Sequence, residues 1–219
     1  MMPAPVRIVI VDDHPVVRRG VRALLESQPG WEVSGEGTTG RQAVQLVKDL
    51  HPHVVVLDLS LPELNGLDAT RQIVKASPQT EVLVLTMHHS EQLARDALQA
   101  GARGYVLKSD ADQSLIAAVE SLSRHKPFLT SKVTQFVLDG YVRRSRAIDD
   151  GTPKSAITPR EREIIQLLVE GSSNKEAAST LGISVKTIEA HRANVMRKLH
   201  LRSISDLVRY AIRNKIVQA

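Results

Sequence analysis

Apolar residues follow two different spacings along the first 126 residues, and the two alternate. Continuous apolar runs such as VRIVIV (6–11) are typical of strands that are buried on both faces of a sheet. Segments such as 15–27 instead place apolar residues three and four apart, which is the spacing of one helix face. The pattern predicts strands at 6–11, 31–36, 53–58, 81–86 and 104–108, and helices at 15–27, 40–50, 66–76, 90–100 and 112–124.

Strands that alternate with helices through short connections indicate an α/β fold. Over residues 1–126 we therefore expect a doubly wound sheet of five parallel strands, in the order 2-1-3-4-5, with helices on both faces. Residues 127–156 are expected to form a linker, because their second half, SRAIDDGTPKSA, is rich in Gly, Pro, Ser and charge. The first half of this linker, at 129–144, has the pattern of a helix.

Residues 157–219 predict a small all-α domain. TPRE (158–161) begins its first helix, with Thr at the N-cap, Pro at the first helical position and Glu at the reciprocal capping position. That helix is expected to reach Gly171. Asn174 is expected to cap a second helix that stops at Gly182, and Ser184 a third over 185–199, with a fourth at about 204–215.

Composition and charge narrow the class of protein. The 219 residues contain no cysteine, which excludes disulfides and thiolate metal sites and makes a reducing cytosol the default compartment. The N-terminal MMPAPVRIVIV lacks the order of a secretory signal, and no apolar stretch approaches membrane-spanning length. We therefore expect a soluble cytoplasmic protein that does not act at a membrane.

The net charge of +5 is divided unevenly. Residues 1–126 carry a formal charge of −2, and residues 127–219 carry +7. The basic second part favours a polyanion such as nucleic acid as its partner. A basic surface that only faces solvent would give the same asymmetry.

Three carboxylates fall at the ends of predicted strands. Asp12 and Asp13 follow the first strand, and Asp58 follows the third. Asp58 alone could equally well cap a turn. In a parallel sheet of order 2-1-3-4-5, however, the first and third strands meet at the switch point where ligands bind. Converging carboxylates repel unless a cation lies between them, and Mg²⁺ prefers oxygen ligands. The fourth strand ends at Thr86 and the fifth near Lys108, so a hydroxyl and an ammonium join the acids and complete a site for a phosphoryl group.

This constellation resembles the receiver domain of bacterial two-component response regulators, over about residues 6–125. The resemblance implies an acid pair that holds Mg²⁺ (Asp12 and Asp13), a phospho-acceptor (Asp58), a further metal ligand (the backbone carbonyl of Ser60), a switch pair (Thr86 and Tyr105) and a phosphate-binding lysine (Lys108). Many receivers have proline after that lysine, whereas Ser109 stands here, so the shape of this loop is not carried over.

Residues 174–199 have a helix-turn-helix pattern, which a simple packing unit of two helices would share. With Ile188 at the centre of the buried face, the opposite face of the second helix carries Lys186, Ala190, Ala193 and Arg197, and Glu189 and Asn194 flank it. Small alanines between basic and polar residues suit close entry into a DNA major groove. Lys186, Arg197 and Lys198 are expected at phosphates, and Glu189 can accept from a cytosine amino group.

The stretch LLVEGSSNKEAASTLGISVKTIEAHRANVMRKL resembles the LuxR-type DNA-binding domain, over about residues 157–217. Residues at that family's signature positions include Gly171, Asn174, Thr187, His191, Asn194 and Lys198. The alignment implies base-facing positions for Glu189, Ala190 and Ala193. His191 is expected to orient or pack the helix, and Arg192 receives no role. His88 and His89, just after Thr86, are expected to face solvent.

The two domains together resemble the NarL/FixJ class of response regulators. The resemblance implies a protein that accepts a phosphoryl group from a sensor histidine kinase on Asp58, and thereby controls its dimerisation and its sequence-specific binding to double-stranded DNA. Its own catalysis would be limited to Mg²⁺-dependent self-phosphorylation from a donor and slow loss of the phosphate.

Two alternatives remain from the residues alone. One is a phosphatase, although Ser60 stands where a second acid would be expected. The other is a protein–protein adaptor whose helical module never touches DNA.

Overall fold

The computed structural model describes residues 5–131, 133–135, 157–214 and 216–217, and these form two compact units. The first unit holds the elements from β1 to β6, and the second holds those from α7 to α10. Among the described residues, no helix combines the length and apolar character that a membrane span requires.

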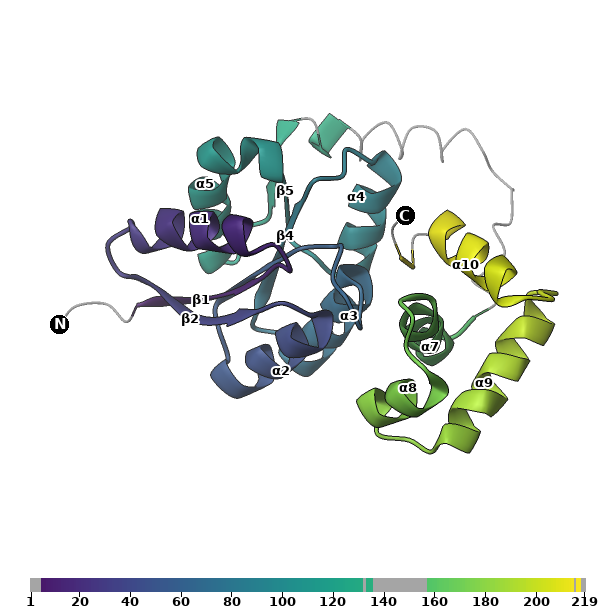
Figure 1. Cartoon of the computed structure of the whole chain (residues 1–219). Helices are drawn as coiled ribbons and strands as arrows, with labels where there is room; N and C mark the ends of the chain where they lie inside the picture. Colours follow the sequence, from purple (N-terminus) through teal and green to yellow (C-terminus); the bar gives the residue numbers. More distant parts are fainter. Residues whose placement is uncertain (1–4, 132, 136–156, 215, 218–219) are drawn as a thin grey trace. The chain divides into compact units, whose positions relative to one another are not determined.

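The first unit is built on a parallel sheet with the strand order β2-β1-β3-β4-β5-β6 (Figure 1). Its strands are β1 (Val6–Val11), β2 (Trp31–Gly37), β3 (Val54–Leu57), β4 (Glu81–Thr86), β5 (Gly104–Leu107) and β6 (Phe128–Leu129). The α/β class and the order of the first five strands are confirmed. The predicted number of strands was one too low, because the two-residue β6 pairs in parallel with Gly104 and Tyr105 at the edge that β5 would otherwise leave open.

Helices cover both faces of this sheet (Figure 1). They are α1 (Pro15–Glu26), α2 (Gly40–Leu50), α3 (Gly66–Ala76), α4 (Glu91–Ala100) and α5 (Ala111–Ser123), with a short 3-10 turn, η1 (Lys108–Asp110), before α5. Side chains of α1 and α5, among them Leu25 and Leu115, share one buried cluster with the strand residues Ile10, Val56 and Leu83. The strands are valine- and leucine-rich because both of their faces are covered, which is why the sequence shows continuous runs rather than alternation.

The second unit consists of α7 (Pro159–Val169), α8 (Asn174–Leu181), α9 (Val185–Lys198) and α10 (Ile204–Arg213). Two buried clusters hold it together. Ile165, Val195 and Leu207 join α7, α9 and α10, while Ile164 and Ile188 belong to a cluster that also takes in α8. The predicted buried face of α9, centred on Ile188, is confirmed, and the unit has a hydrophobic core of its own.

Capping fixes where these helices start. Thr158 and Glu161 form the predicted capping box at the start of α7, and Ser184 caps α9 as expected. The prediction that Asn174 caps α8 was wrong: Ser173 is the N-cap, and Asn174 is the first helical residue. The reason is that Ser173 and Glu176 have the capping-box spacing, which satisfies two backbone N–H groups where a lone Asn would satisfy one.

Some predicted helix ends differ from the observed ones. α7 ends at Val169 rather than Gly171, which follows in a left-handed conformation with φ 98°. α10 ends at Arg213, and residue 215 lies outside the described residues. The linker helix predicted at 129–144 was given too early a start, because Phe128–Leu129 form β6, and from 136 onward it lies outside the described residues.

Candidate functional site

Asp12 and Asp58 lie side by side because their strands are neighbours in the sheet. Val11 pairs with Leu57 at the ends of β1 and β3, and the Asp58 N–H donates to the Val11 carbonyl at 2.9 Å. Each aspartate directly follows its strand. Both are almost fully buried, with 3% of Asp12 and 2% of Asp58 exposed. The predicted convergence of these two carboxylates at the switch point is therefore present.

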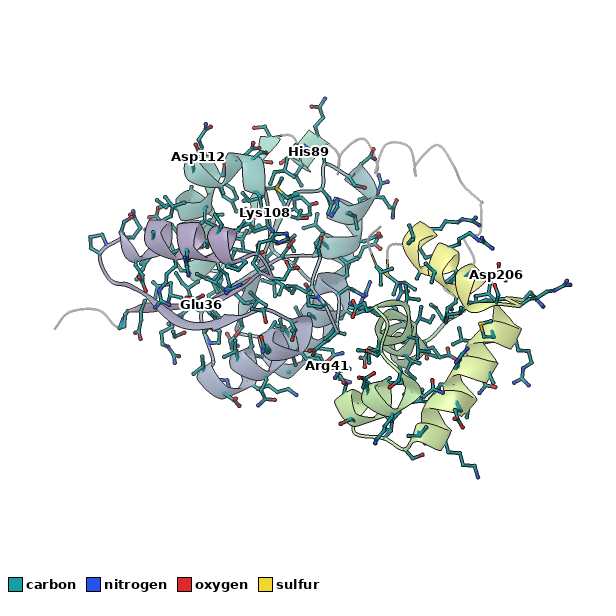
Figure 2. The ribbon with its side chains drawn as sticks, viewed as in Figure 1. Glu36, Arg41, His89, Lys108, Asp112 and Asp206 are labelled. Atoms are coloured by element: carbon teal, nitrogen blue, oxygen red, sulfur yellow. The ribbon has the colours of Figure 1, made fainter. Side chains whose placement is uncertain are left out.

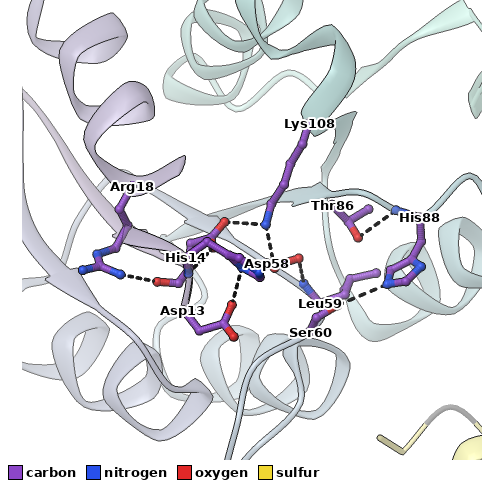
Figure 3. Close-up of polar contacts among 10 residues, drawn as sticks. Asp13, His14, Arg18, Asp58, Leu59, Ser60, Thr86, His88 and Lys108 are labelled. Atoms are coloured by element: carbon purple, nitrogen blue, oxygen red, sulfur yellow. Dashed lines mark hydrogen bonds and ion pairs between the residues drawn. The ribbon is translucent and has the colours of Figure 1, made fainter. Parts of the chain in front are cut away.

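Lys108 reaches this pair from the end of β5 (Figure 3). Its Nζ lies 2.6 Å from Asp12 Oδ2 and 2.8 Å from Asp58 Oδ2. Burial raises the pKa of Asp58, and the hydrogen bond from Lys108 opposes that rise. Burial lowers the pKa of Lys108, but its contacts with the two carboxylates outweigh this effect, so the pKa is raised overall and the ammonium is kept.

The acidic cluster fits a divalent cation. Asp12, Asp13, His14 and Asp58 each offer a ligand atom within 4.8 Å of the others. Among the described residues, the buried Asp12 Oδ2 has Lys108 as an ion-pair partner but no aligned hydrogen-bond donor, so it has capacity for a cation. An oxygen-rich donor set of this kind suits Mg²⁺. His14 was not among the predicted ligands, and its place directly after the acid pair is the signal that could have suggested it.

Thr86 and Tyr105 are linked through one residue, His88. Thr86 is fully buried, and its Oγ1 accepts from the His88 N–H at 3.3 Å. Tyr105 is 1% exposed, and its hydroxyl donates to the His88 carbonyl at 3.1 Å. Burial, together with the charge of Asp58, raises the pKa of Tyr105 to about 12. The Tyr105 side chain is thus buried and points inward in this structure.

The prediction that His88 faces solvent was wrong. Its side chain is half-buried, and its Nε2 lies 3.2 Å from Ser60 Oγ in the loop after Asp58 (Figure 3). His89 is exposed, as expected (Figure 2). A sequence pattern could not distinguish these two histidines, because the contact depends on how two loops approach each other across the sheet edge.

Gly66 allows the loop after Asp58 to return close to the backbone of Asp58. A Cβ at Gly66 would lie 2.2 Å from the Asp58 carbonyl oxygen and 2.6 Å from Leu59 Cα. The Gly66 N–H donates to the Leu59 carbonyl at 2.9 Å. Such an approach of backbone to backbone is possible for glycine alone.

The second unit presents one face of α9 to solvent. Lys186, Glu189, Ala190, Ala193 and Arg197 are exposed, while Thr187 and Asn194 are half-buried. The two exposed alanines leave room for another surface to approach the helix backbone closely. This is the face that the helical wheel predicts for DNA.

Lys198 and Arg197 have protein partners as well. Lys198 Nζ lies 2.6 Å from Oε1 of Glu161, whose side chain is only 5% exposed, so the pair ties the end of α9 to the start of α7. Arg197 donates to Asn194 Oδ1 at 2.7 Å on the exposed surface. The predicted phosphate contact of Lys198 stays a prediction, and the ion pair gives this residue a structural role that the sequence did not suggest.

Comparison with known proteins finds a family match for each of the two units. Residues 8–120 match the model of the response regulator receiver domain, and residues 155–211 match that of the luxR family of bacterial regulatory proteins. Oxygen regulatory protein NreC of Staphylococcus carnosus (strain TM300) is 39% identical over 214 residues, which cover 96% of this chain and 99% of that protein.

Solved structures show the same likeness. A two-component response regulator of the LuxR family from Aurantimonas sp. SI85-9A1 is 36% identical, with a TM-score of 0.60, and covers 64% of this chain and 99% of its own. The response regulator RcsB in a complex with DNA is 28% identical, with a TM-score of 0.58, and covers 94% of this chain and 97% of its own.

Proposed function

The chain belongs to the two-component response regulators that join a receiver domain to a LuxR-type DNA-binding domain, and from that premise we propose that Asp58 accepts the phosphoryl group. The protein controls transcription. The observation that carries the proposal is a carboxylate with 2% exposure at the end of a central strand, with an ammonium 2.8 Å away. We take the receiver to be residues 1–126, the linker 127–156 and the DNA-binding domain 157–219.

The reaction at Asp58 is a nucleophilic attack. A carboxylate oxygen attacks phosphorus, the bond from phosphorus to the donor breaks, and the donor leaves with the electron pair, which gives an acyl phosphate on Asp58. The Leu59 N–H donates to Oδ1 at 2.7 Å and Lys108 binds Oδ2, so the carboxylate is held in one orientation. Lys108 then offers positive charge to the phosphoryl oxygens, which carry most of the charge in the transition state.

The acid pair would hold a metal at this site. Asp12 and Asp13, with Asp58 and the backbone carbonyl of Ser60, would hold Mg²⁺, which supplies positive charge to the phosphoryl oxygens when bound. The phosphoryl group on Asp58 would then bias a two-state element. The Thr86 hydroxyl is an acceptor for the His88 N–H, which leaves its own proton to donate to the phosphate.

The switch and the DNA-binding face define the partners. Movement of Thr86 would displace the His88 backbone, because the two are hydrogen-bonded. Tyr105 is hydrogen-bonded to the same backbone, so the surface near α4 and β5 would change as well. A histidine kinase in the cytosol would supply the phosphoryl group, and a second copy of the chain would bind when the protein is phosphorylated or on DNA. The small alanines of α9 would lie in the major groove. The proposed DNA-contacting set is Lys186, Thr187, Glu189, Ala190, Ala193, Asn194, Arg197 and Lys198.

Intact mass spectrometry after incubation with acetyl phosphate tests the acceptor. The wild-type protein should gain the mass of one phosphate when Mg²⁺ is present and none when the metal is chelated. Asp58→Asn should gain none, whereas Asp112→Asn, which changes an exposed aspartate in the first turn of α5, should behave as wild type (Figure 2). Labelling that persists in Asp58→Asn would disprove the assignment.

A further inference from the structure

Arg18 joins the acidic site to strand β2. From α1, its Nη1 donates to the Asp12 carbonyl oxygen at 2.8 Å, and its Nε lies 3.2 Å from Glu36 Oε2. The Arg18 side chain is 18% exposed and that of Glu36 is 29% exposed, so the pair is partly shielded from solvent. Figure 3 shows Arg18 reaching the backbone beside Asp13, and Figure 2 places Glu36 on the same unit.

The Asp12 carbonyl matters because it belongs to the peptide that connects the two acids. A peptide unit is planar, so the direction of the Asp12 C=O fixes where Asp13 Cα lies. The Asp12 N–H still donates to the Gly37 carbonyl at 3.2 Å, as in a continuing sheet, but the Asp12 carbonyl lies past the end of β1 and accepts from Arg18. Where the chain turns toward α1, Arg18 therefore donates the hydrogen bond that a neighbouring strand would donate within the sheet.

Asp13 depends on this backbone for its direction. Its side chain is 37% exposed, and its carboxylate contacts the His14 ring, itself 63% exposed, at 2.8 Å. An exposed pair of this kind contributes little to holding a geometry. Asp12 is in a different position, since it is buried and its Oδ1 accepts from the His14 N–H at 2.9 Å.

We propose that Arg18 is a positioning residue for the cation site: Glu36 orients its guanidinium, which holds the Asp12–Asp13 peptide so that both carboxylates face one divalent cation. The proposal rests on the magnesium site of the proposed function. Glu36 also lowers the electrostatic cost of a positive charge near that site, because the guanidinium is paired on its far side. Groups that orient metal ligands from behind commonly matter for metal affinity.

Arg22 offers a matched control within the same helix. It lies four residues after Arg18 and forms ion pairs with Glu36 and with Glu26, the latter at 2.9 Å. Arg22 and Arg18 thus share Glu36 and carry the same charge. Of the two, Arg18 is the one bonded to the Asp12 carbonyl.

The test is a magnesium titration of the full-length protein by isothermal titration calorimetry. Arg18→Ala should weaken Mg²⁺ binding by roughly three- to tenfold, at or below the lower end of the usual effect of such groups. This direction is diagnostic, because removing a positive charge near a cation site would by itself tighten binding. Arg22→Ala should bind Mg²⁺ as tightly as wild type or slightly more tightly. Unchanged or tighter binding in Arg18→Ala, or an equal loss in Arg22→Ala, would overturn the proposal.

Arg18→Lys provides the conservative variant. It keeps the charge, but a single ammonium group cannot reproduce the guanidinium that binds the Asp12 carbonyl and Glu36 together, so its affinity should lie between those of Arg18→Ala and wild type. Unfolding temperatures without metal show whether each variant is folded. If Arg18→Ala is unfolded, Arg18→Lys decides: weaker binding than wild type supports the proposal, and wild-type affinity overturns it.

Phosphorylation kinetics separate positioning from general damage. In Arg18→Ala the Mg²⁺ concentration that gives half the maximal rate with acetyl phosphate should rise by the same factor as the dissociation constant, while the maximal rate stays at the wild-type level. A lower maximal rate with an unchanged magnesium requirement would contradict the inference. If wild type itself neither binds Mg²⁺ nor takes up phosphate, the proposed function fails; if it does both and Arg18→Ala matches it, this inference alone fails.

Discussion

Asp12, Asp58 and Lys108 place two negative charges and one positive charge in a nearly buried space. Both aspartates are almost inaccessible to water, and 6% of the Lys108 side chain is exposed. Burying an unbalanced charge costs free energy, so the remaining negative charge favours the binding of a further cation at this site. Lys108 is shared between Asp58 and Asp12, so the charge of Asp58 is only partly balanced.

The pKa of Asp58 should depend on Lys108. Burial raises the pKa of Asp58 above 3.8, and Lys108 holds it down. Removing the ammonium in Lys108→Met should therefore raise the pKa further, so that the carboxylate is lost at a higher pH. The Asp58 side-chain carbon signal in NMR, followed against pH without metal, measures this shift directly. An equal or lower pKa in Lys108→Met would show that the ion pair does not hold the charged form.

Gly66 should be irreplaceable because of its contact with the backbone of Asp58, the proposed acceptor. In Gly66→Ala the new Cβ meets the Asp58 carbonyl oxygen at 2.2 Å, so the loop must shift, at a cost of about 1–3 kcal/mol in the free energy of unfolding. Phosphorylation of Asp58 should slow as well. Gly20→Ala in α1 is the control: its Cβ would meet no described atom within 4 Å, and it should stabilise the protein by about 0.5–1 kcal/mol. Urea unfolding of both variants decides; equal effects would refute the steric argument.

Single residues of the site differed in how far the sequence could predict them. Asp12, Asp58 and Lys108 follow strands, and the carboxyl ends of parallel strands meet at one edge, so their convergence follows from the pattern alone. Arg18 and His88 act through contacts between a helix or loop and a backbone atom. Such contacts depend on side-chain reach and loop path, which hydrophobic spacing does not encode.

At the scale of elements, strands β1 to β5 and the helices of the two units followed the apolar pattern closely, because each of them buries at least one face. β6 has two residues, too few to show any spacing, and it forms because β5 offers an open edge. The start of α8 was misplaced for a different reason: two adjacent residues can both cap a helix, and the partner three positions on decides between them.

The ion pair between α7 and α9 predicts different roles for two neighbouring basic residues. Burial raises the pKa of Glu161, but its bonds to Lys198 and Thr158 outweigh this and lower it overall. Lys198→Gln should therefore cost about 1 kcal/mol of unfolding free energy at neutral pH, a modest value because the Lys198 side chain is 42% exposed. Arg197→Gln, on the exposed surface, should change stability little and weaken binding to every DNA sequence.

The pH dependence of this difference has a definite sign. A carboxylate with a lowered pKa adds stability above its ordinary pKa of 4.5, and that contribution is lost as the pH falls through the lowered value. The difference between wild type and Lys198→Gln should thus be constant at neutral pH and shrink below about 4.5. Denaturant unfolding at several pH values, with fluorescence anisotropy on duplex DNA, measures both properties. If Lys198→Gln leaves stability unchanged and loses DNA affinity as Arg197→Gln does, Lys198 is a phosphate contact rather than a structural residue.

At the scale of the whole molecule, the two domains differ in net charge. Residues 1–126 carry −2 and residues 127–219 carry +7, which suits a receiver that binds a cation and a domain that meets DNA. A single helix-turn-helix offers few base contacts, so proteins of this kind commonly bind two half-sites as dimers. The proposed phosphorylation site is in one domain and the proposed DNA-binding face is in the other, so we expect phosphorylation to act through a change in assembly or in the availability of α9.

Phosphorylation of Asp58 should therefore tighten DNA binding in the full-length protein and not in the isolated segment 150–219. The second unit has its own buried clusters, so that segment should fold and bind DNA without phosphate. With acetyl phosphate and Mg²⁺, the full-length protein should shift toward a dimer in sedimentation and bind a two-half-site duplex, selected from genomic fragments, more tightly. Asp58→Asn should show neither change. Higher salt should weaken all of these complexes, because contacts with phosphates release counterions. If phosphorylated protein dimerises no more and binds no tighter than unphosphorylated protein, the two domains are not coupled through Asp58, whatever each does alone.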